Sequence, residues 1–171
     1  MTKNSFLDIK AADKSYQKVR IAHWDGVARK TDKRQGFGGY YHKRLMQVVQ
    51  FVVPPGQKII EIGCGGGDLL AALWPSHGVG VDFSPQMIAR ARERYPHLHF
   101  IEADAHELDI QTEFDFIILS DLVNDLWDVQ AVLQRIKTIT SSRSRIIINS
   151  YSRLWEWPLG IARKLGLAKP N

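Results

Sequence analysis

The chain of 171 residues has a single cysteine, Cys64, and no long apolar stretch. One cysteine cannot form an intramolecular disulfide, which favours a reducing cytoplasm. Without a run of about 18 apolar residues or a signal-peptide pattern, the sequence predicts no membrane span and no export. Histidines, cysteines and acids do not cluster at metal-ligand spacing, so we expect no metal site.

A strong compositional bias is also missing. Hydrophobic residues make up 44% of the chain, as in an ordinary globular protein, and the length fits a single domain spanning residues 1–171. The net charge is +5 at pH 7, but acids are interleaved with the basic residues. We interpret these charges as solvated helix faces and do not expect nucleic acid as the main partner.

The most informative stretch is KIIEIGCGGGDLL, residues 58–70. A short apolar run predicts a buried strand, and a leucine-rich helix begins just after the glycines. Such a turn lets the backbone approach a ligand closely. The third glycine of a dinucleotide fingerprint is replaced by Asp68, and Glu61 ends the strand. Two carboxylates disfavour a pyrophosphate and favour a cationic ligand.

Further strands are predicted at residues 78–83, 98–104, 114–121 and 145–151, separated by amphipathic helices. This alternation predicts a Rossmann-like, doubly wound α/β sheet of about five mainly parallel strands with helices on both faces. Asp82 ends the second strand, where an acid accepts hydrogen bonds from ribose hydroxyls; it also precedes a helix as a cap-like residue. Phe83 is placed to lie along an adenine. The fourth strand lies beside the first, so Ser120 and Asp121 face the ligand.

Residues 1–36 form an N-terminal segment in which Ala12, Tyr16, Val19 and His23 recur at helical spacing. A helix that packs over the ligand as a lid is expected there. A second amphipathic helix around residues 45–52 ends at Pro54. The glycine- and tyrosine-rich segment before it is either an aromatic-lined edge of the site or part of the core. Residues 37–171 are then the ligand-binding core.

Taken together, EIGCGGG, VDFSPQMIARA, EADAHEL and FDFIILSDL resemble the class I S-adenosylmethionine (SAM) methyltransferases over about residues 40–165. The resemblance implies SAM as cofactor. It implies that Asp104 accepts from the adenine amino group while the Ala105 amide donates to the ring. The cofactor-binding residues expected on this basis are Glu61, Gly63, Cys64, Gly65, Asp82, Phe83, Asp104, Ala105 and Ser120.

The segments GVGVDFSPQMI and NSYSRLWE are most similar to bacterial methyltransferase domains that occur alone or joined to family 2 glycosyltransferases. A small-molecule or glycan-related acceptor is therefore expected. DNA methyltransferases carry the motif N/D-P-P-Y after the fourth strand, whereas this sequence has SDLVND there. This difference argues against adenine N-methylation. Candidates for a general base, should the acceptor need one, are His106, Asp121, His42 and His23.

The resembled family continues past the fifth helix into a C-terminal hairpin of two strands, and this hairpin is absent from the sequence, which ends at Asn171. The fifth strand is then expected to be a sheet edge that pairs with a second copy in a homodimer. The alternatives are a SAM-binding but catalytically incomplete protein that acts with a partner, an RNA methyltransferase, and an NAD-type oxidoreductase. Asp68 weighs against the last of these.

Overall fold

The computed structural model describes residues 20–22, 26, 37–150 and 161. Most of the expected N-terminal helix, including His23, lies outside the described residues. So does the expected C-terminal helix with the tryptophans that precede it, Trp155 and Trp157.

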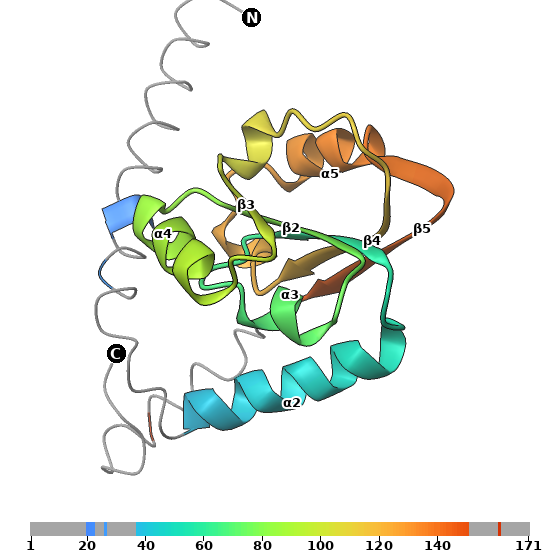
Figure 1. Ribbon diagram of the computed structural model, residues 1–171. Helices are drawn as coiled ribbons and strands as arrows, with labels where there is room; N and C mark the ends of the chain where they lie inside the picture. The colour runs from blue at the N-terminus through green and yellow to red at the C-terminus, as the bar shows by residue number, and fades with distance from the viewer. Residues whose placement is uncertain (1–19, 23–25, 27–36, 151–160, 162–171) are drawn as a thin grey trace, which may run out of the picture.

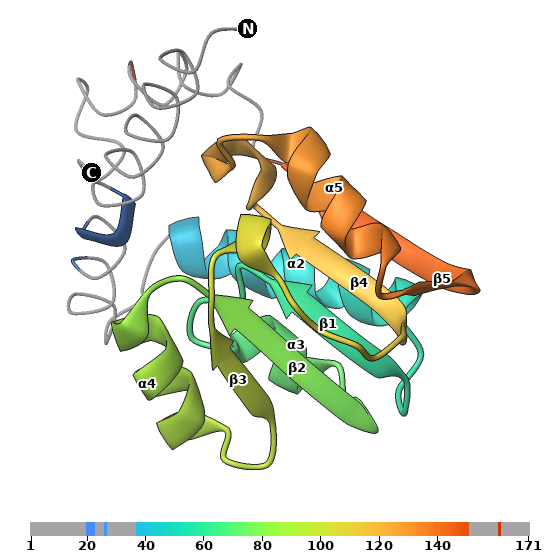
Figure 2. The ribbon, with the colours of Figure 1, turned by 90° about the horizontal axis from the view of Figure 1, so that it is seen from above.

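The centre of the fold is a parallel sheet of five strands in the order β3-β2-β1-β4-β5 (Figure 2). The strands are β1 (Lys58–Ile62), β2 (His77–Asp82), β3 (His99–Glu102), β4 (Phe114–Ser120) and β5 (Thr140–Asn149). The strand order reverses between β1 and β4, which pair in parallel with Ile62 opposite Leu119. In sheets of this kind ligands bind at that reversal, beyond the carboxyl ends of the strands.

Helices cover both faces of the sheet (Figure 1). One face carries α2 (Phe37–Val52), α3 (Asp68–Ala72) and α4 (Pro85–Arg94), and the other carries α5 (Val129–Lys137) and the 3-10 turn η2 (Ala105–Glu107). Alternate strand residues supply the two cores, as side chains of a strand point to opposite faces. Ile60 and Ile117 face α5, whereas Ile59 and Ile118 face α2 and α3. The predicted doubly wound α/β fold is confirmed.

Local sequence signals explain where the helices begin. At the start of α4 the Ser84 hydroxyl accepts a hydrogen bond from the Met87 amide, and Pro85 takes the first helical position. At the start of α5 the Asp128 carboxylate caps the Ala131 amide. These caps fix where the loops after β2 and β4 end, and those loops carry the site.

Two elements are longer than the sequence predicts. Helix α2 begins at Phe37, so the glycine- and tyrosine-rich segment is helical, and its Tyr40 and Tyr41 are exposed rather than part of the core. Strand β5 begins at Thr140, because its polar first half still pairs with β4 across an irregularity between Phe114 and Phe116. Polar residues that lack alternation give no strand signal in the sequence.

Within the described part of the chain, β5 pairs with β4 alone, and Ile146 and Ile148 on it are about half exposed. Pairing of this edge with a second copy stays a prediction. None of the described helices has the length and apolar character needed to cross a membrane.

Candidate functional site

The glycine turn after β1 is held against the sheet. The Gly63 amide donates to the Val81 carbonyl at 2.7 Å. Gly63 has a φ of +77°, and a Cβ built on it would lie 2.9 Å from the Leu122 Cδ1 atom. Glycine is therefore required here both by the left-handed backbone and by the close approach of the loop after β4. The glycine turn and the loop after β4 together form one wall of the candidate site.

Asp82 lies at the end of β2, as predicted, and only 8% of it is exposed. Its Oδ2 atom accepts from the Gly65 amide at 2.8 Å, and its Oδ1 atom accepts from the Ser84 amide at 2.9 Å. Backbone donors thus fix the carboxylate beside the glycine turn. A carboxylate oxygen accepts up to two hydrogen bonds, so a carboxylate fixed in this way is the kind of group that hydroxyl donors of a ligand require.

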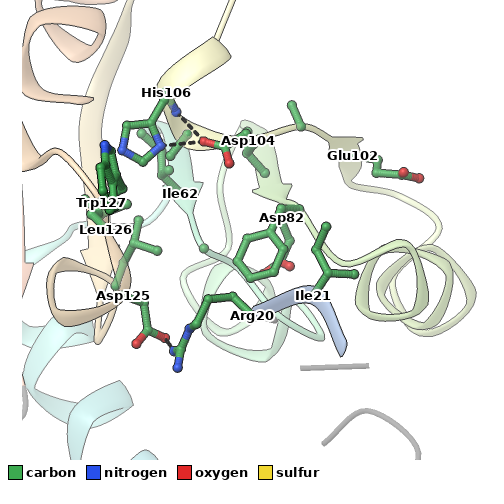
Figure 3. Close-up of a pocket in the computed structure, with 16 residues that line it drawn as sticks. Arg20, Ile21, Ile62, Asp82, Glu102, Asp104, His106, Asp125, Leu126 and Trp127 are labelled. Atoms are coloured by element: carbon green, nitrogen blue, oxygen red, sulfur yellow. Dashed lines mark hydrogen bonds and ion pairs between the residues drawn. The ribbon is translucent and has the colours of Figure 1, made fainter. Parts of the chain in front are cut away.

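A cavity of about 190 Å³ opens at the carboxyl ends of β1 to β4 (Figure 3). Polar groups on its wall include Asp82 and Asp104, and the apolar part includes Leu122, Leu126 and Trp127. The expected residues Gly63, Phe83 and Ala105 also line it. The cavity joins a broad groove whose lining includes Glu61, Cys64, Gly65, Ser120 and Asp121. The structure therefore brings all the expected ligand-binding residues to one place.

Asp104 and His106 are linked within this cavity. The Asp104 Oδ1 atom lies 2.6 Å from His106 Nδ1 and accepts from the His106 amide at 2.7 Å. The Asp128 amide donates to His106 Nε2 at 3.1 Å. With Nε2 accepting, the ring proton belongs on Nδ1 and is donated to Asp104. His106 must give up the Asp128 hydrogen bond before it can take a proton from an acceptor.

The N-terminal segment contributes two residues that the sequence did not single out. Arg20 and Ile21 line the cavity, and the Arg20 guanidinium forms an ion pair with Asp125 in the 3-10 turn η3 (Val123–Asp125) (Figure 3). The covering role expected for residues 1–36 stays a prediction, since most of that segment lies outside the described residues. Nothing local marks Arg20, because its partner lies 105 residues away.

The acids of the glycine stretch differ in their surroundings. Glu61 is buried, with 3% exposed, and accepts from the Leu70 amide at 3.0 Å. Burial, together with the nearby carboxylates, raises the pKa of Glu61 to about 8. Asp68 instead accepts from the Tyr95 hydroxyl at 2.7 Å and forms an ion pair with Arg94 at 2.8 Å. The charge of Asp68 is matched inside the chain. Glu61 is mostly protonated at neutral pH, and a cationic group of a ligand beside it would favour its charged form, so Glu61 is the better candidate for a cationic ligand.

Cys64 and Ser120 occupy the ends of neighbouring strands. Burial and the negative charges of Glu61 and Asp82 raise the pKa of the Cys64 thiol well above its usual value. A thiol kept protonated is a poor nucleophile, so Cys64 serves by packing. Ser120, at the end of β4, is half-buried and lines the groove.

Asp121 follows Ser120 and is held by two side chains from distant elements. The Tyr41 hydroxyl donates to Asp121 Oδ1 at 2.7 Å, and Asn149 Nδ2 donates to the same oxygen at 2.8 Å. His42 also lines the groove, with its ring 5.5 Å from that of Tyr41. The sequence argument included Tyr41 only as part of the tyrosine-rich segment and Asn149 only as the first residue of NSYSRLWE, and it assigned neither a role in the site.

A family model described as "Methyltransferase domain" matches residues 54–165, more than half of the chain. The chain belongs to this methyltransferase domain family. Its fold is that of the class I SAM-dependent methyltransferases, as predicted.

Two relatives show how far the similarity of this methyltransferase domain extends. It is 23% identical over 121 residues to a Mycobacterium tuberculosis protein named "Probable S-adenosylmethionine-dependent methyltransferase", covering 67% of the chain and 44% of that protein. It is 49% identical over 57 residues to trans-aconitate 2-methyltransferase of Rhodopseudomonas palustris, covering 31% of the chain and 22% of the relative. The chain thus spans less than half the length of these curated relatives.

Among solved structures, the domain resembles N-methyltransferase NodS from Bradyrhizobium japonicum with a TM-score of 0.58 and 16% identity. The match covers 78% of this chain and 76% of that one. A second structure of NodS contains S-adenosylhomocysteine (SAH). At this identity the similarity concerns the fold.

Proposed function

We propose that this chain binds SAM across the cavity and groove and transfers the methyl group to a small-molecule or glycan-related acceptor. The observation that carries the proposal is Asp82. Backbone amides of Gly65 and Ser84 hold its buried carboxylate at the mouth of a cavity of about 190 Å³. A fixed acid between a glycine turn and a partly apolar cavity suits a ribose that joins an adenine to a charged tail.

The side chains fit the chemistry of SAM. The adenine amino group and ribose hydroxyls are donors, which match Asp104 and Asp82, and the ammonium of the methionine part matches Glu61. Leu122, Leu126 and Trp127 supply an apolar wall against which the adenine ring can pack. Because SAM has no phosphate group, its binding does not require a basic side chain of the kind that holds the pyrophosphate of a dinucleotide.

SAM supplies a methyl group already activated by its positively charged sulfur. The protein therefore has to hold the acceptor in line with that methyl group and to keep water away. Positioning of this kind contributes about 7–11 kcal/mol to the lowering of a barrier. The groove that continues from the cavity past Asp121 is where we place the acceptor.

A first prediction concerns cofactor binding. In calorimetric titrations the purified chain should bind SAM and SAH and should not bind NADH. Asp82→Asn should weaken SAH binding about tenfold or more, since one oxygen that accepts from ribose is replaced by an amide nitrogen. Glu113→Gln is a matched control, because Glu113 is an exposed acid next to the opposite end of β4.

Thermal unfolding of the Asp82→Asn variant must show that it remains folded at the titration temperature. The proposal is overturned if neither SAM nor SAH binds, or if NADH binds in a way that depends on Asp82. Equal SAH affinity in the wild type and a folded Asp82→Asn variant would remove the role assigned to this residue.

A further inference from the structure

Three polar side chains meet at the carboxyl ends of β4 and β5. Asp121 follows β4, Tyr41 lies in the first turns of α2 and Asn149 ends β5. Besides their bonds to Asp121 Oδ1, Tyr41 and Asn149 contact each other, with Asn149 Nδ2 3.3 Å from the Tyr41 hydroxyl oxygen. Two donors from separate elements therefore fix one oxygen of one carboxylate. We call Tyr41, Asp121 and Asn149 the acceptor corner.

The acceptor corner lies beside the glycine turn. Ile62 pairs with Leu119 at the ends of parallel β1 and β4, and Gly63 and Asp121 follow these paired residues by one and two positions. The side chain of Leu122, the next residue, packs against Gly63. Tyr41 and Asp121 line the same groove as Glu61 and Gly65. The corner is thus on the acceptor side of the proposed SAM site.

Within the described part of the chain, the side-chain hydrogen bonds to Asp121 all go to its Oδ1 atom. Among the described residues, its Oδ2 atom has no hydrogen-bond partner, and this atom is not buried. A carboxylate oxygen left without a donor at a groove is free to accept one from a ligand. Two fixed donors on Oδ1 restrict the rotation of the carboxylate and so define where Oδ2 lies.

The backbone at Asp121 is strained as well. Its φ is +54°, in the left-handed region that residues other than glycine rarely adopt. The Asp121 amide donates to the Asn149 carbonyl at 3.2 Å, so Asn149 holds both the main chain and the side chain of this residue. Strain of this kind persists where the surroundings hold it in place. A glycine would avoid the strain but would supply no carboxylate.

Other polar groups near the groove are less suited to accept a hydrogen bond from the methyl acceptor. His106 Nε2 already accepts from Asp128, and Asp125 is paired with Arg20. Of the basic residues that line the groove, Arg90 and Arg94 belong to α4, which follows β2, whereas His42 and Lys43 lie on α2 next to Tyr41. Among the described residues, none of these basic side chains forms an ion pair with Asp121, so the negative charge at the corner is not neutralised by direct contact.

We propose that Asp121 Oδ2 accepts the hydrogen of the methyl acceptor, that Tyr41 and Asn149 are its positioning residues, and that the acceptor is consequently an amine or a hydroxyl rather than a carboxylate. A carboxylate acceptor would meet like charge at this corner. The inference rests on the proposed function, because it assigns the acceptor half of the same site.

In the step itself, a lone pair of the acceptor nitrogen or oxygen forms the new bond to the methyl carbon. The carbon–sulfur bond breaks, and its electron pair stays on sulfur, which becomes neutral. The acceptor proton passes to Asp121 Oδ2 and then to water. Asp121 is thus a catalytic residue in this proposal, while Tyr41 and Asn149 act through it.

The test uses a probe that carries an amine at the reacting position. Sinefungin is a SAM analogue in which a carbon bearing a primary amine replaces the methylated sulfur, and SAH has no group there. The measured quantity is the amine preference, defined as the ratio of the Kd of SAH to the Kd of sinefungin by calorimetry. The wild-type chain should bind sinefungin about tenfold more tightly than SAH, because an ammonium meets a carboxylate oxygen.

Asp121→Asn should lower the amine preference about tenfold while SAH affinity changes by less than about twofold. Asp121→Gly is a second variant that suits the positive φ and keeps the test valid should the asparagine variant misfold. Tyr41→Phe and Asn149→Ala should lower the preference about threefold or more, since they remove the fixed donors. Tyr40→Phe is the control, because Tyr40 is 71% exposed on the same helix.

The outcomes separate the two proposals. If the wild-type chain fails to bind SAH, the proposed function is overturned, and the inference falls with it. If SAH binds and the amine preference is the same in wild type, Asp121→Asn and Asp121→Gly, only the inference is overturned. If Asp121→Asn lowers the preference but Tyr41→Phe and Asn149→Ala do not, the positioning roles are wrong.

Discussion

The cavity side of the site and the acceptor corner are built in different ways. In the cavity, Asp82 accepts from backbone amides that lie 2 and 17 residues away in the sequence. At the acceptor corner, Asp121 accepts from side chains that lie 28 and 80 residues away. Backbone donors are present whatever the side chains are, whereas side-chain donors depend on particular residues. The first arrangement is suited to a constant ligand, and the second to a ligand that differs between relatives.

The largest expected effect is a loss of folding stability on substitution of Gly63, where the glycine turn of the cavity side contacts the loop that carries Asp121. Gly63→Ala should lower the free energy of unfolding by about 3–4 kcal/mol, because the new Cβ adopts a left-handed φ and lies 2.9 Å from Leu122. Gly56→Ala is the matched control, since Gly56 has nearly the same φ of +78° and no atom within 4 Å of a built Cβ. The control should lose about 1–2 kcal/mol in urea denaturation.

SAH affinity should fall in Gly63→Ala and stay the same in Gly56→Ala. Equal losses of stability in the two variants would show that Leu122 moves away at no cost. The two sides of the site would then not be rigidly joined through this contact.

The next effect in size concerns pH. The pKa of Glu61 is raised from 4.5 to about 8, so between these values the folded chain keeps a proton that the unfolded chain has released. Its contribution to the free energy of unfolding therefore falls as pH rises through this window. The fall should amount to about 2–4 kcal/mol, at about 1.4 kcal/mol for each pKa unit.

Glu61→Gln does not titrate, so urea denaturation from pH 5 to pH 8 should show that this fall is missing in the variant. Glu113→Gln, which changes an exposed acid, should retain it. Parallel pH profiles for the wild type and Glu61→Gln would contradict the raised pKa.

The smallest effect sharpens the comparison between the two sides. His106→Ala should weaken SAH binding about fivefold, because Asp104 loses the ring that orients it. The amine preference should not change, since His106 belongs to the cavity side. His99→Ala is the control, because His99 is exposed at the beginning of β3. A change in the amine preference in His106→Ala would show that the two sides are coupled.

The same contrast explains what was predictable from the sequence. The sheet, the glycine turn and the strand-ending acids Asp82 and Asp104 follow from local patterns, because each strand places its last residues at the same edge. No local pattern of this kind marks Leu122 and Trp127 as part of the apolar wall of the cavity. Asn149 was missed because its partners lie far from it in the sequence. Asp68 suggested a ligand contact, but Arg94 and Tyr95, residues of the next helix and its end, take up its charge.

The ion pair between Arg20 and Asp125 has a consequence for the mechanics of binding. Arg20 and Ile21 line one side of the cavity, and the sheet with its loops lines the other. A ligand in the cavity therefore contacts both of these parts of the chain, which the ion pair between Arg20 and Asp125 also joins. Ligand binding should therefore stabilise the contact between the Arg20 region and the loops of the sheet. Proteolytic cleavage at Arg20 should then be slower when the ligand is present.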